Sequence, residues 1–457
     1  MININVLDKD FNIVGVIDYY ESFIWTDRFK SYGDFELYSG VDSKILDLCL
    51  QDYYLQINES DHMMIIDSID ITTNPETGNH IKITGKSLES LLKRRIIWDQ
   101  TTVSGGRDHT LKTAIEVLFK LCFGFGPQGT EITKNEKIGG QTVKRIPYIR
   151  STVALSNGRT QTIDVRKERV IRNLLYLKPV DTIMQYWDEE AEQYKDILID
   201  KTQFIGDNLY DIITSIMDSY SNYGLGYRIL PLYSMRKIYT DAYIKEHIGL
   251  TNEEWEEVVA DDYAMVFEIY TGKNRSYEQI DNPYVVFSPD FDNIINTDYY
   301  DSLEGYKNVT LILGEGEGTD RVRLIMGGTD DQGAYIPSIE RRELYTDARE
   351  LQSSEYPSSN DYMTALKQKG MEKLYESTRQ LVYDGEVEAE RTFVYGLDFI
   401  MGDVIQIENE FGIAGKARVI EYIISEDQNG RSFYPTFDSV ELISDYTENE
   451  TDVEEES

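Results

Sequence analysis

The sequence predicts a β-rich α+β protein, with two small β-barrel-like domains at the chain ends flanking a mixed α/β middle. Three observations indicate this fold class. Short apolar and β-branched runs fill the first hundred positions at roughly ten-residue spacing, which is typical of a small barrel or sandwich. Helical periodicity appears mainly in the middle of the chain. Strand-length runs then return near the C-terminus.

Residues 1–100 form the first predicted β-barrel-like domain. Its expected strands are the runs NINVLD, IVGVIDY, SFIWT, DFELYSG, YYLQINES, HMMIIDSIDITT, HIKITG and RRIIW. Residues 80–84 alternate apolar and polar side chains, which predicts a half-buried strand rather than a loop.

The tripeptide GKS at 85–87 raises the question of a phosphate-binding loop. Such a loop needs another glycine five positions before the first residue of this tripeptide, and that position is His80. A nucleotide site is therefore disfavoured. The stretch instead predicts a strand, a turn at the glycine, and a short amphipathic helix that is capped by Ser87 and ends at Arg94 and Arg95.

Residues 101–300 form a predicted mixed α+β middle domain with insertions. The run DHTLKTAIEVLFK predicts a helix with Asp108 or Thr110 as its cap. The run DNLYDIITSIMDSY predicts a second helix, which Asp207 is expected to cap. Both runs place their apolar residues at helical spacing, so each is expected to bury one face.

Two further stretches of the middle domain have patterns of their own. Residues 123–165 are rich in Gly, Thr and Lys and indicate a long hairpin or a mobile loop. Residues 240–262 are expected to be helical, because Thr251 and Glu254 have the spacing of a capping box.

The C-terminal third is predicted to contain three segments. Residues 301–384 are expected to form an α+β connector with a long helix after YPSSNDY. Residues 385–445 form the second predicted β-barrel-like domain, from the runs ERTFVYG, DVIQIEN, KARVIEYIISED and SFYPTFDSVELI. Residues 446–457 are acidic and lack apolar anchors, which predicts a disordered tail.

Charge limits the partners of this chain. It has 82 acidic and 45 basic side chains, giving a formal net charge of −37. Nucleic-acid affinity depends largely on Lys and Arg, so specific DNA binding is not expected. The basic run KRR at 93–95 stands out against this background. The 34 tyrosines suit protein interfaces and carbohydrate surfaces alike, so composition alone does not choose between them.

Cysteines and targeting signals give little indication of function. Cys49 and Cys122 lie in apolar contexts and are predicted to be buried thiols rather than a disulfide. No apolar run approaches the ~18 residues of a membrane span, so no transmembrane segment is expected. The start MININVLDKDF has neither the basic nor the apolar region of an export signal.

The histidines and a glycine-rich run do not match known site patterns. His62, His80, His109 and His247 are far apart and lack metal-ligand spacing. The run GEGEG at 314–318 follows an expected strand, as a dinucleotide-binding fingerprint would, but it leads into another strand. A turn or bulge is therefore predicted there.

Two acidic pairs are candidate sites by residue type. Asp290 and Asp292 have the residue type of glycosidase carboxylates, although such pairs arise by chance in an acidic chain. Asp330 and Asp331 lack the full spacing of a calcium loop. We therefore predict no catalytic residue, no cofactor and no metal site, and we expect a protein that is not an enzyme.

Four segments carry a resemblance to a known family. They are, in order, GKSLESLLKRRIIW, DNLYDIITSIMDSYSNYGLGYRI, FSPDFDNI followed by YKNVTLILGEGEGTDR, and YGLDFIMGDVIQIENEFGIAGKARV. In this order they resemble the siphovirus ReqiPepy-type tail-protein family, with residues 123–200 and 231–262 divergent or inserted. That family is similar to the baseplate hub, or tail-associated, proteins at the tip of phage tails and related contractile injection systems.

The resemblance implies a structural role with hub-protein architecture. Such proteins form a homotrimer, a ring in which two barrel-like domains per chain approximate six-fold symmetry. The ring joins the tail tube to the tip or fibre proteins, and DNA transits it without specific binding. The implied partners are distal tail or tail tube proteins and tail-tip or fibre proteins. The implied location is the virion tail tip, after assembly in the host cytoplasm.

Two other function classes stay open at this point. A glycan-binding or glycan-cleaving tail-tip protein would need a concave, Tyr-lined site with convergent carboxylates. A tube-capping or baseplate protein of another topology would share the acidity and the oligomerisation.

Five residues are candidate structural or interface positions. Gly402 and Asp403 in IMGDVIQI are predicted to make the turn that opens the C-terminal barrel. Lys93, Arg94 and Arg95 are predicted to face protein, either pairing with carboxylates of a neighbouring subunit or satisfying the end of their own helix.

Overall fold

The computed structural model divides into two compact units. The residues it describes are 1–457 except 75, 77, 104–109, 125–129, 156–157, 172–173, 180–183, 189–192, 200–201, 260–263, 330–333, 357, 387–391, 410, 412–413 and 444–457. Unit 1 comprises Met1–Glu89, Thr271–Ser302 and Gln380–Ser457. Unit 2 comprises Ser90–Tyr270 and Leu303–Arg379. The predicted acidic tail, 446–457, lies outside the described residues.

Unit 1 is built around one large sheet. Its strands run in the order β19-β23-β26-β25-β3-β4-β7-β6-β5-β1-β2, with β24 paired to β25 and β18 to β24. The strands are β1 (Ile4–Leu7), β2 (Ile13–Ile17), β3 (Ser22–Arg28), β4 (Asp34–Gly40), β5 (Tyr54–Gln56), β6 (Met63–Asn74), β7 (Gly78–Ser87), β18 (Val286–Phe287), β19 (Ile295–Ser302), β23 (Gln380–Glu386), β24 (Val404–Glu408), β25 (Ala414–Asp427) and β26 (Gly430–Ile443). The unit also contains the helices α1 (Ser43–Leu48) and η5 (Pro289–Phe291).

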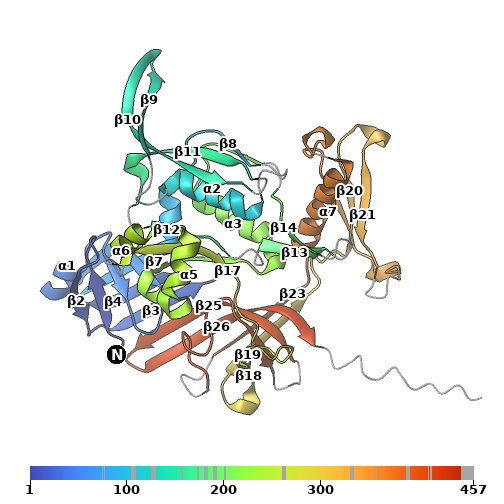
Figure 1. The fold of residues 1–457 in the computed structure, drawn as a ribbon. Coiled ribbons are helices and arrows are strands. Elements are labelled where there is room, and N and C mark those ends of the chain that lie inside the picture. Colours follow the sequence, from blue (N-terminus) through green and yellow to red (C-terminus); the bar gives the residue numbers. More distant parts are fainter. Residues whose placement is uncertain are drawn as a thin grey trace, which may run out of the picture. The chain divides into compact units, whose positions relative to one another are not determined.

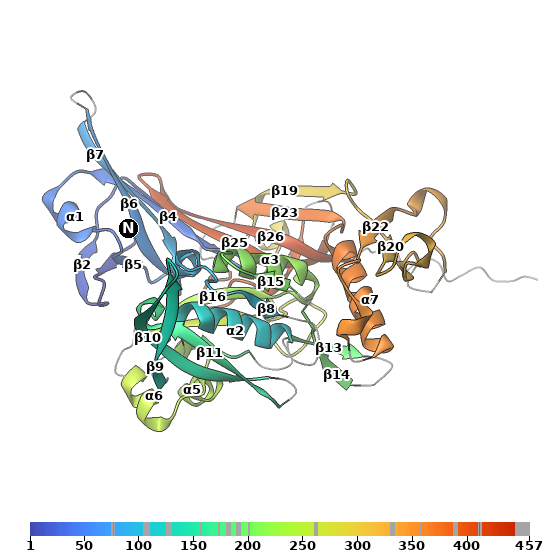
Figure 2. The ribbon, with the colours of Figure 1, turned by 90° about the horizontal axis from the view of Figure 1, so that it is seen from above.

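The two strand-dense ends of the chain share this sheet. β25 pairs antiparallel with β3, from Glu421 opposite Arg28 to Asp427 opposite Ser22. At one end of this seam, Arg28 Nε donates to Glu421 at 2.6 Å. Figures 1 and 2 show the C-terminal strands beside the N-terminal ones. The β-rich α+β class is thus confirmed, while closure of each end as a separate barrel and the predicted domain bounds stay predictions.

Side-chain alternation explains why the N-terminal strands form. In β4, Phe35 and Leu37 are buried, and in β7, Ile81 and Ile83 are buried, while their neighbours are more exposed. This period of two gives each strand one apolar face. Large buried aromatic residues fill the interior of unit 1: Phe23, Trp25, Phe29, Phe35, Phe287, Phe399 and Phe437.

Gly85 does not turn the chain, so that prediction is wrong. β7 continues through it, paired with β4 on one side and β6 on the other. A Cβ atom on Gly85 would lie 1.9 Å from the carbonyl oxygen of Ile65, so glycine is required by a close approach of strands. Ser87 Oγ accepts the Gly33 N–H at 2.8 Å instead of capping a helix, and the 3₁₀ helix η1 (Leu88–Arg94) follows. The GKS amides therefore do not form an anion-binding loop.

The first part of unit 2 has a three-stranded sheet with helices on both faces. The sheet order is β12-β17-β16, with β12 (Leu174–Leu177), β16 (Gly226–Pro231) and β17 (Met265–Tyr270). The helices are α2 (Leu111–Phe123), α3 (Leu209–Ser219), α4 (Leu232–Ile238), α5 (Asp241–Ile248) and α6 (Asn252–Val259). Val266 packs with residues of α4 and α5, whereas the next residue, Phe267, stacks on Phe119 of α2 at 4.7 Å between ring centroids. Successive strand residues point to opposite faces, so α2 and the α4–α5 pair cover different sides.

Smaller strand groups complete this part of unit 2. They are β9 (Thr130–Ile138), β10 (Gln141–Ala154) and β11 (Thr160–Arg166), β8 (Thr101–Val103) with β15 (Thr202–Phe204), and β13 (Gln185–Asp188) with β14 (Gln193–Asp196). The hairpin predicted within 123–165 is confirmed, and Figure 1 shows β9 and β10 as a long two-stranded arm. The 3₁₀ helices η2 (Lys167–Arg169) and η4 (Ser221–Tyr223) connect the elements.

The predicted helices exist, but one cap was misplaced. α2 begins at the N-cap Thr110, whose side chain accepts the Thr113 N–H, while Asp108 lies outside the described residues. α3 is capped by Asn208 and not by Asp207. The Asp207 carboxylate instead accepts the backbone N–H of Ile205 at 2.9 Å.

The capping box predicted in 240–262 is confirmed. The Glu254 carboxylate accepts the Thr251 N–H at 2.8 Å, and Thr251 Oγ1 accepts the Glu254 N–H at 3.4 Å. These reciprocal bonds satisfy backbone donors at the start of α6.

The second part of unit 2 is a three-stranded sheet with one long helix. The order is β21-β20-β22, with β20 (Val309–Leu313), β21 (Arg323–Gly327) and β22 (Glu343–Asp347), and the helix is α7 (Ser359–Tyr375). The 3₁₀ helices η6 (Gly318–Asp320), η7 (Ser338–Glu340) and η8 (Ser353–Glu355) lie in its loops. Gly370 of α7 faces Ile312, and a Cβ there would lie 2.2 Å from Ile312 Cδ1. Glycine therefore lets helix and sheet approach closely.

Candidate functional site

The cysteines carry no thiolate chemistry. Cys49 and Cys122 are both buried and free, as predicted. Burial raises the pKa of the Cys49 thiol to about 12 and that of the Cys122 thiol to about 11. Both side chains are therefore protonated at neutral pH, and neither is an activated nucleophile.

Two of the histidines lie beside single carboxylates rather than in a cluster of metal ligands. Among the residues that the structure describes, no three His, Cys, Asp or Glu side chains are placed to hold a metal ion. His62 Nδ1 lies 3.4 Å from Glu89, and His80 Nδ1 lies 3.2 Å from Glu21. His109 lies outside the described residues.

The acidic pair Asp290 and Asp292 is not part of a buried site. Asp290 and Asp292 are both exposed, and Asp292 has a left-handed φ of 50° at the end of η5. A glycosidase needs two carboxylates facing each other across a substrate cleft, and exposed turn residues do not supply this. Asp330 and Asp331 lie outside the described residues. The glycine run at 314–318 forms a turn before β21, with positive φ at Gly316 and Gly318, as predicted.

Gly402 and Asp403 lie together in the turn that leads into β24. Gly402 has a φ of +87°, which favours glycine, and a Cβ there would lie 2.4 Å from the ring of Phe29. Its carbonyl oxygen accepts from Arg418 Nη1 at 2.7 Å. Glycine is therefore required at position 402 by the backbone conformation and by the lack of room for a Cβ atom.

Asp403 is the centre of a buried hydrogen-bond network. Its carboxylate accepts from the backbone N–H of Lys273 at 2.7 Å, from the N–H of Ile400 at 3.1 Å, and from Arg275 Nε at 2.6 Å. The Asp403 side chain is 0% exposed and that of Arg275 is 11% exposed. The carboxylate has no surface on which a substrate could meet it, and it joins the turn to a second chain segment.

The basic residues at 93–95 have three different surroundings. Lys93 is exposed, and its Nζ lies 4.6 Å from the ring centroid of Tyr210. Arg94 is exposed. Arg95 is partly buried, and its Nε and Nη2 donate to the carbonyl oxygen of Arg169 at 3.2 and 3.1 Å. The end of η1 is therefore tied to η2, within unit 2.

Arg169 and Trp98 extend this basic surface. Arg169 Nη2 donates to the Ile96 carbonyl at 2.5 Å, and its guanidinium carbon lies 5.6 Å from the Trp98 ring centroid. We call Arg94, Arg95, Ile96, Trp98 and Arg169 the basic–aromatic patch. Trp98 is 51% exposed and Ile96 40% exposed. The patch therefore presents apolar side chains between cations.

Sequence reasoning found only part of this patch. Arg94 and Arg95 stand out in the sequence as a basic run, whereas Arg169 is more than seventy positions away. The run RKER at 166–169 is a basic signal that was available, but no periodicity links it to Trp98. Only the tertiary fold brings the two together.

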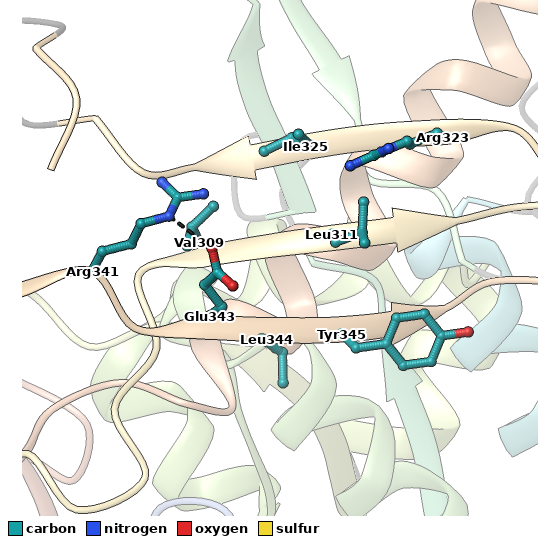
Figure 3. A pocket seen from close by; sticks show the side chains of 8 residues that line it. All are labelled: Val309, Leu311, Arg323, Ile325, Arg341, Glu343, Leu344 and Tyr345. Atoms are coloured by element: carbon teal, nitrogen blue, oxygen red, sulfur yellow. Dashed lines mark hydrogen bonds and ion pairs between the residues drawn. The ribbon is translucent and has the colours of Figure 1, made fainter. Parts of the chain in front are cut away.

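The β21-β20-β22 sheet has one covered face and one open face. Ile312, Leu324 and Met326 pack beneath α7. On the opposite face, Leu311 lies between Ile325 of β21 and Tyr345 of β22 in the strand register. Ile325 is 54% exposed and Tyr345 is 53% exposed. These side chains line a concavity of about 340 Å³. Figure 3 shows how they lie on the three strands.

Charged side chains border this concavity. Arg341 Nε pairs with Glu343 at 2.8 Å at one end, and Arg323 lies at the other end in Figure 3. Arg321 pairs with Asp347 nearby. The open face thus combines an apolar row with a polar rim, the composition of a small ligand or interface site.

The structure has no helical membrane span within its described residues, because none of those helices is both long and apolar enough.

Comparison with known proteins identifies related folds. The chain is similar to the tail protein from Neisseria meningitidis MC58, with 12% identity, a TM-score of 0.51 and coverage of 96% of each chain. It is also similar to the 43 kDa tail protein of prophage MuSo2 from Shewanella oneidensis, with 10% identity, a TM-score of 0.52 and coverage of 95% of this chain and 98% of the other. At these identities the likeness is one of fold. No curated protein matches the sequence.

A family model extends over most of the chain. The model described as Siphovirus ReqiPepy6 Gp37-like protein matches residues 3–124 and 152–437. The unmatched stretch between them includes β9 and most of β10, whereas residues 152–200 and 231–262, which we expected to diverge, lie inside the match. Because the match spans well over half of the sequence, the chain belongs to the siphovirus ReqiPepy6 Gp37-like protein family.

Proposed function

We propose that the protein is a structural hub of a phage tail, a ring of three copies at the tail tip. The ring joins the tail tube to tip or fibre proteins and lets DNA pass. Membership of a siphovirus family supports a place in the virion tail, and the fold is similar over nearly its whole length to two tail proteins. Assembly would take place in the host cytoplasm.

The sheet of unit 1 carries this proposal. Pairing of β3 with β25 makes the strands of both chain ends one continuous surface. A continuous hydrogen-bonded sheet resists deformation better than two domains joined by a linker, which suits the wall of a tube. Its terminal strands need cover from neighbours, and a ring of copies supplies that cover.

The proposed role needs no catalysis. Asp403 is enclosed by hydrogen bonds, the cysteines are buried thiols, and Asp290 and Asp292 are exposed at a turn. A conduit for DNA also works best when its wall does not hold the cargo. The net charge of −37 supports a wall that does not bind DNA. Acidic side chains repel the phosphates over roughly one Debye length, ~8 Å at physiological salt.

The test is to locate and count the protein in assembled particles. Phage tails that carry a tagged copy of the chain are imaged by cryo-electron microscopy with symmetry left free. The expected result is three copies at the tail tip. One or six copies per tail, or density elsewhere along the tail, would overturn the hub proposal.

The open face of the β21-β20-β22 sheet favours a second candidate, a glycan-binding tail-tip protein. Exposed Tyr345 beside Arg341 and Glu343 offers a stacking surface with hydrogen-bonding groups. A pull-down on host cell-wall sugars tests this candidate, with Tyr345→Ala as the variant that should lose binding. A hydrolysis assay on the same sugars tests whether the protein also cleaves them.

A further inference from the structure

The basic–aromatic patch holds two guanidinium groups without carboxylate partners. Within the described part of the chain, Arg95 donates to the carbonyl oxygens of Arg94 and Arg169, and Arg169 donates to that of Ile96. Each guanidinium also lies near an aromatic ring, Arg169 contacts the Cys122 thiol, and neither arginine forms an ion pair with another described residue. The pKa of Arg95 is lowered, first by burial and next by the positive charge of Arg169. The two cations thus repel each other, and an arriving carboxylate would be attracted by both.

The apolar part of the patch is exposed and held in place. The Trp98 ring lies 4.4 Å from the guanidinium carbon of Arg166 and 5.6 Å from that of Arg169. These cation–π contacts fix the indole while half of it stays accessible. Trp and Arg dominate the binding energy of protein interfaces, and a preorganised Trp loses little entropy on binding.

The surroundings of the patch favour a protein over a nucleic acid. The adjacent cations are already neutralised, since Arg166 pairs with Glu136 and Lys167 pairs with Glu131 at 2.6 Å. Asp99 is exposed next to Trp98. A nucleic acid needs a run of unpaired cations along its backbone, whereas this patch offers a few cations bordered by carboxylates. An isolated carboxylate beside an apolar group fits it better.

We propose that the basic–aromatic patch docks an acidic surface of a second copy of this chain. A second copy carries a net charge of −37, with 82 acidic against 45 basic side chains, so it offers many carboxylates that could complement the patch. The contact is head-to-tail, because a two-fold contact centred on the patch would place arginine against arginine. Head-to-tail contacts are the kind that close into rings. The proposal rests on the hub proposal and adds the surface that joins its subunits.

The first experiment measures self-association of the full-length chain. Sedimentation velocity over a range of protein concentrations, at low and physiological salt, should show association of the wild type that weakens with salt. The double variant Trp98→Ala/Arg169→Glu should raise the dissociation constant by at least about 30-fold, the effect of losing one dominant interface side chain. Arg349→Glu, the same charge change at an arginine that is 64% exposed and lies outside both the patch and the concavity, is the matched control and should associate like the wild type.

A second experiment examines the assembled tail, where partner proteins are present. A photo-reactive benzoylphenylalanine replaces Trp98 in one virus stock and Tyr345, which is equally exposed, in another. A crosslink from position 98 to another copy of the chain supports the proposal. A crosslink only to a different protein, or none, overturns it, and so does self-association that the double variant leaves unchanged.

Two further outcomes separate this proposal from others. Salt-sensitive binding of a 20-base-pair duplex, lost in Arg169→Glu while self-association persists, would assign the patch to nucleic acid instead. Three copies at the tail tip without a crosslink between copies at position 98 would retain the hub and reject this surface. Far-ultraviolet circular dichroism of each variant confirms that the fold is kept.

Discussion

Asp403 is a buried carboxylate that links two distant parts of the chain. Its carboxylate and the Arg275 guanidinium are nearly excluded from water, and their bond joins segments 128 positions apart. A buried ion pair adds little net stability compared with apolar replacements, but removing one partner leaves the other charge buried and uncompensated. The consequence of mutation is therefore large even if the pair itself contributes little.

We predict that Asp403→Ala lowers the free energy of unfolding by about 3–5 kcal/mol, because Arg275 is left buried without its partner. Chemical denaturation measures the change. Asp290→Ala, at an exposed turn aspartate, is the control and should change stability little. A folded, assembled Asp403→Ala protein that had lost a hydrolytic activity would contradict the structural role.

Gly402 permits a test that separates backbone strain from steric clash. Gly402 and Gly396 have nearly the same φ, +87° and +83°, but a Cβ at Gly396 meets nothing within 4 Å, whereas at Gly402 it meets Phe29 at 2.4 Å. Gly396→Ala should cost about 1–2 kcal/mol from the left-handed backbone alone. Gly402→Ala should cost clearly more, and equal losses in thermal denaturation would show that Phe29 yields without penalty.

At the scale of elements, β16 and β17 are joined by a buried charge pair. Arg228 and Glu268 are directly opposite in the strand register, and Arg228 Nε donates to Glu268 at 2.5 Å. Both side chains are nearly inaccessible, and the guanidinium carbon lies 4.0 Å from the Tyr270 ring centroid. The β12-β17-β16 sheet, which lies between α2 and the α4–α5 pair, therefore contains this buried ion pair.

We predict that Glu268→Leu destabilises the protein by about 3–5 kcal/mol, since it leaves the Arg228 charge buried without a partner. The double variant Arg228→Met/Glu268→Leu should recover most of the loss, because two apolar side chains of similar size need no partner. Equilibrium denaturation of wild type, single and double variants forms the test. A double variant as unstable as the single one would show that other polar neighbours need this pair.

Local elements were predictable from sequence, and long-range pairing was not. The capping box at Thr251, the stripe of α3 and the alternation in β7 depend on neighbours within a few positions. The pairing of β3 with β25 and the extension of β7 through Gly85 depend on strands elsewhere in the chain. A glycine in a strand and a glycine in a turn look alike when the closely packed neighbour is unknown.

The same distinction between local and long-range information applies to the candidate site residues. The sequence singled out Gly402, Asp403 and the basic run at 93–95, because turn chemistry and charge are visible locally. It missed Arg275, Arg169 and Trp98, since each meets its partner only after folding. The interface roles of Lys93, Arg94 and Arg95 stay predictions that the association experiments test.

At the scale of the whole molecule, the excess of acidic side chains predicts that the protein does not bind DNA. We expect no retention of a 20-base-pair duplex at physiological salt, measured by fluorescence anisotropy, because −37 opposes the polyanion. Arg94→Glu with Arg95→Glu should impair assembly without removing any DNA affinity. Duplex binding by the wild type that this double reversal abolishes, in particles that still assemble, would mean that these residues line the DNA channel.

The seam between β3 and β25 has a consequence for synthesis of the protein. Arg28 and Glu421 are 393 positions apart, so β3 keeps an unpaired edge while the intervening chain is made. At about 5–20 residues per second, that interval lasts tens of seconds. A truncated product would expose this edge permanently and be prone to aggregate. A chain that ends before β25 therefore cannot complete the sheet of unit 1.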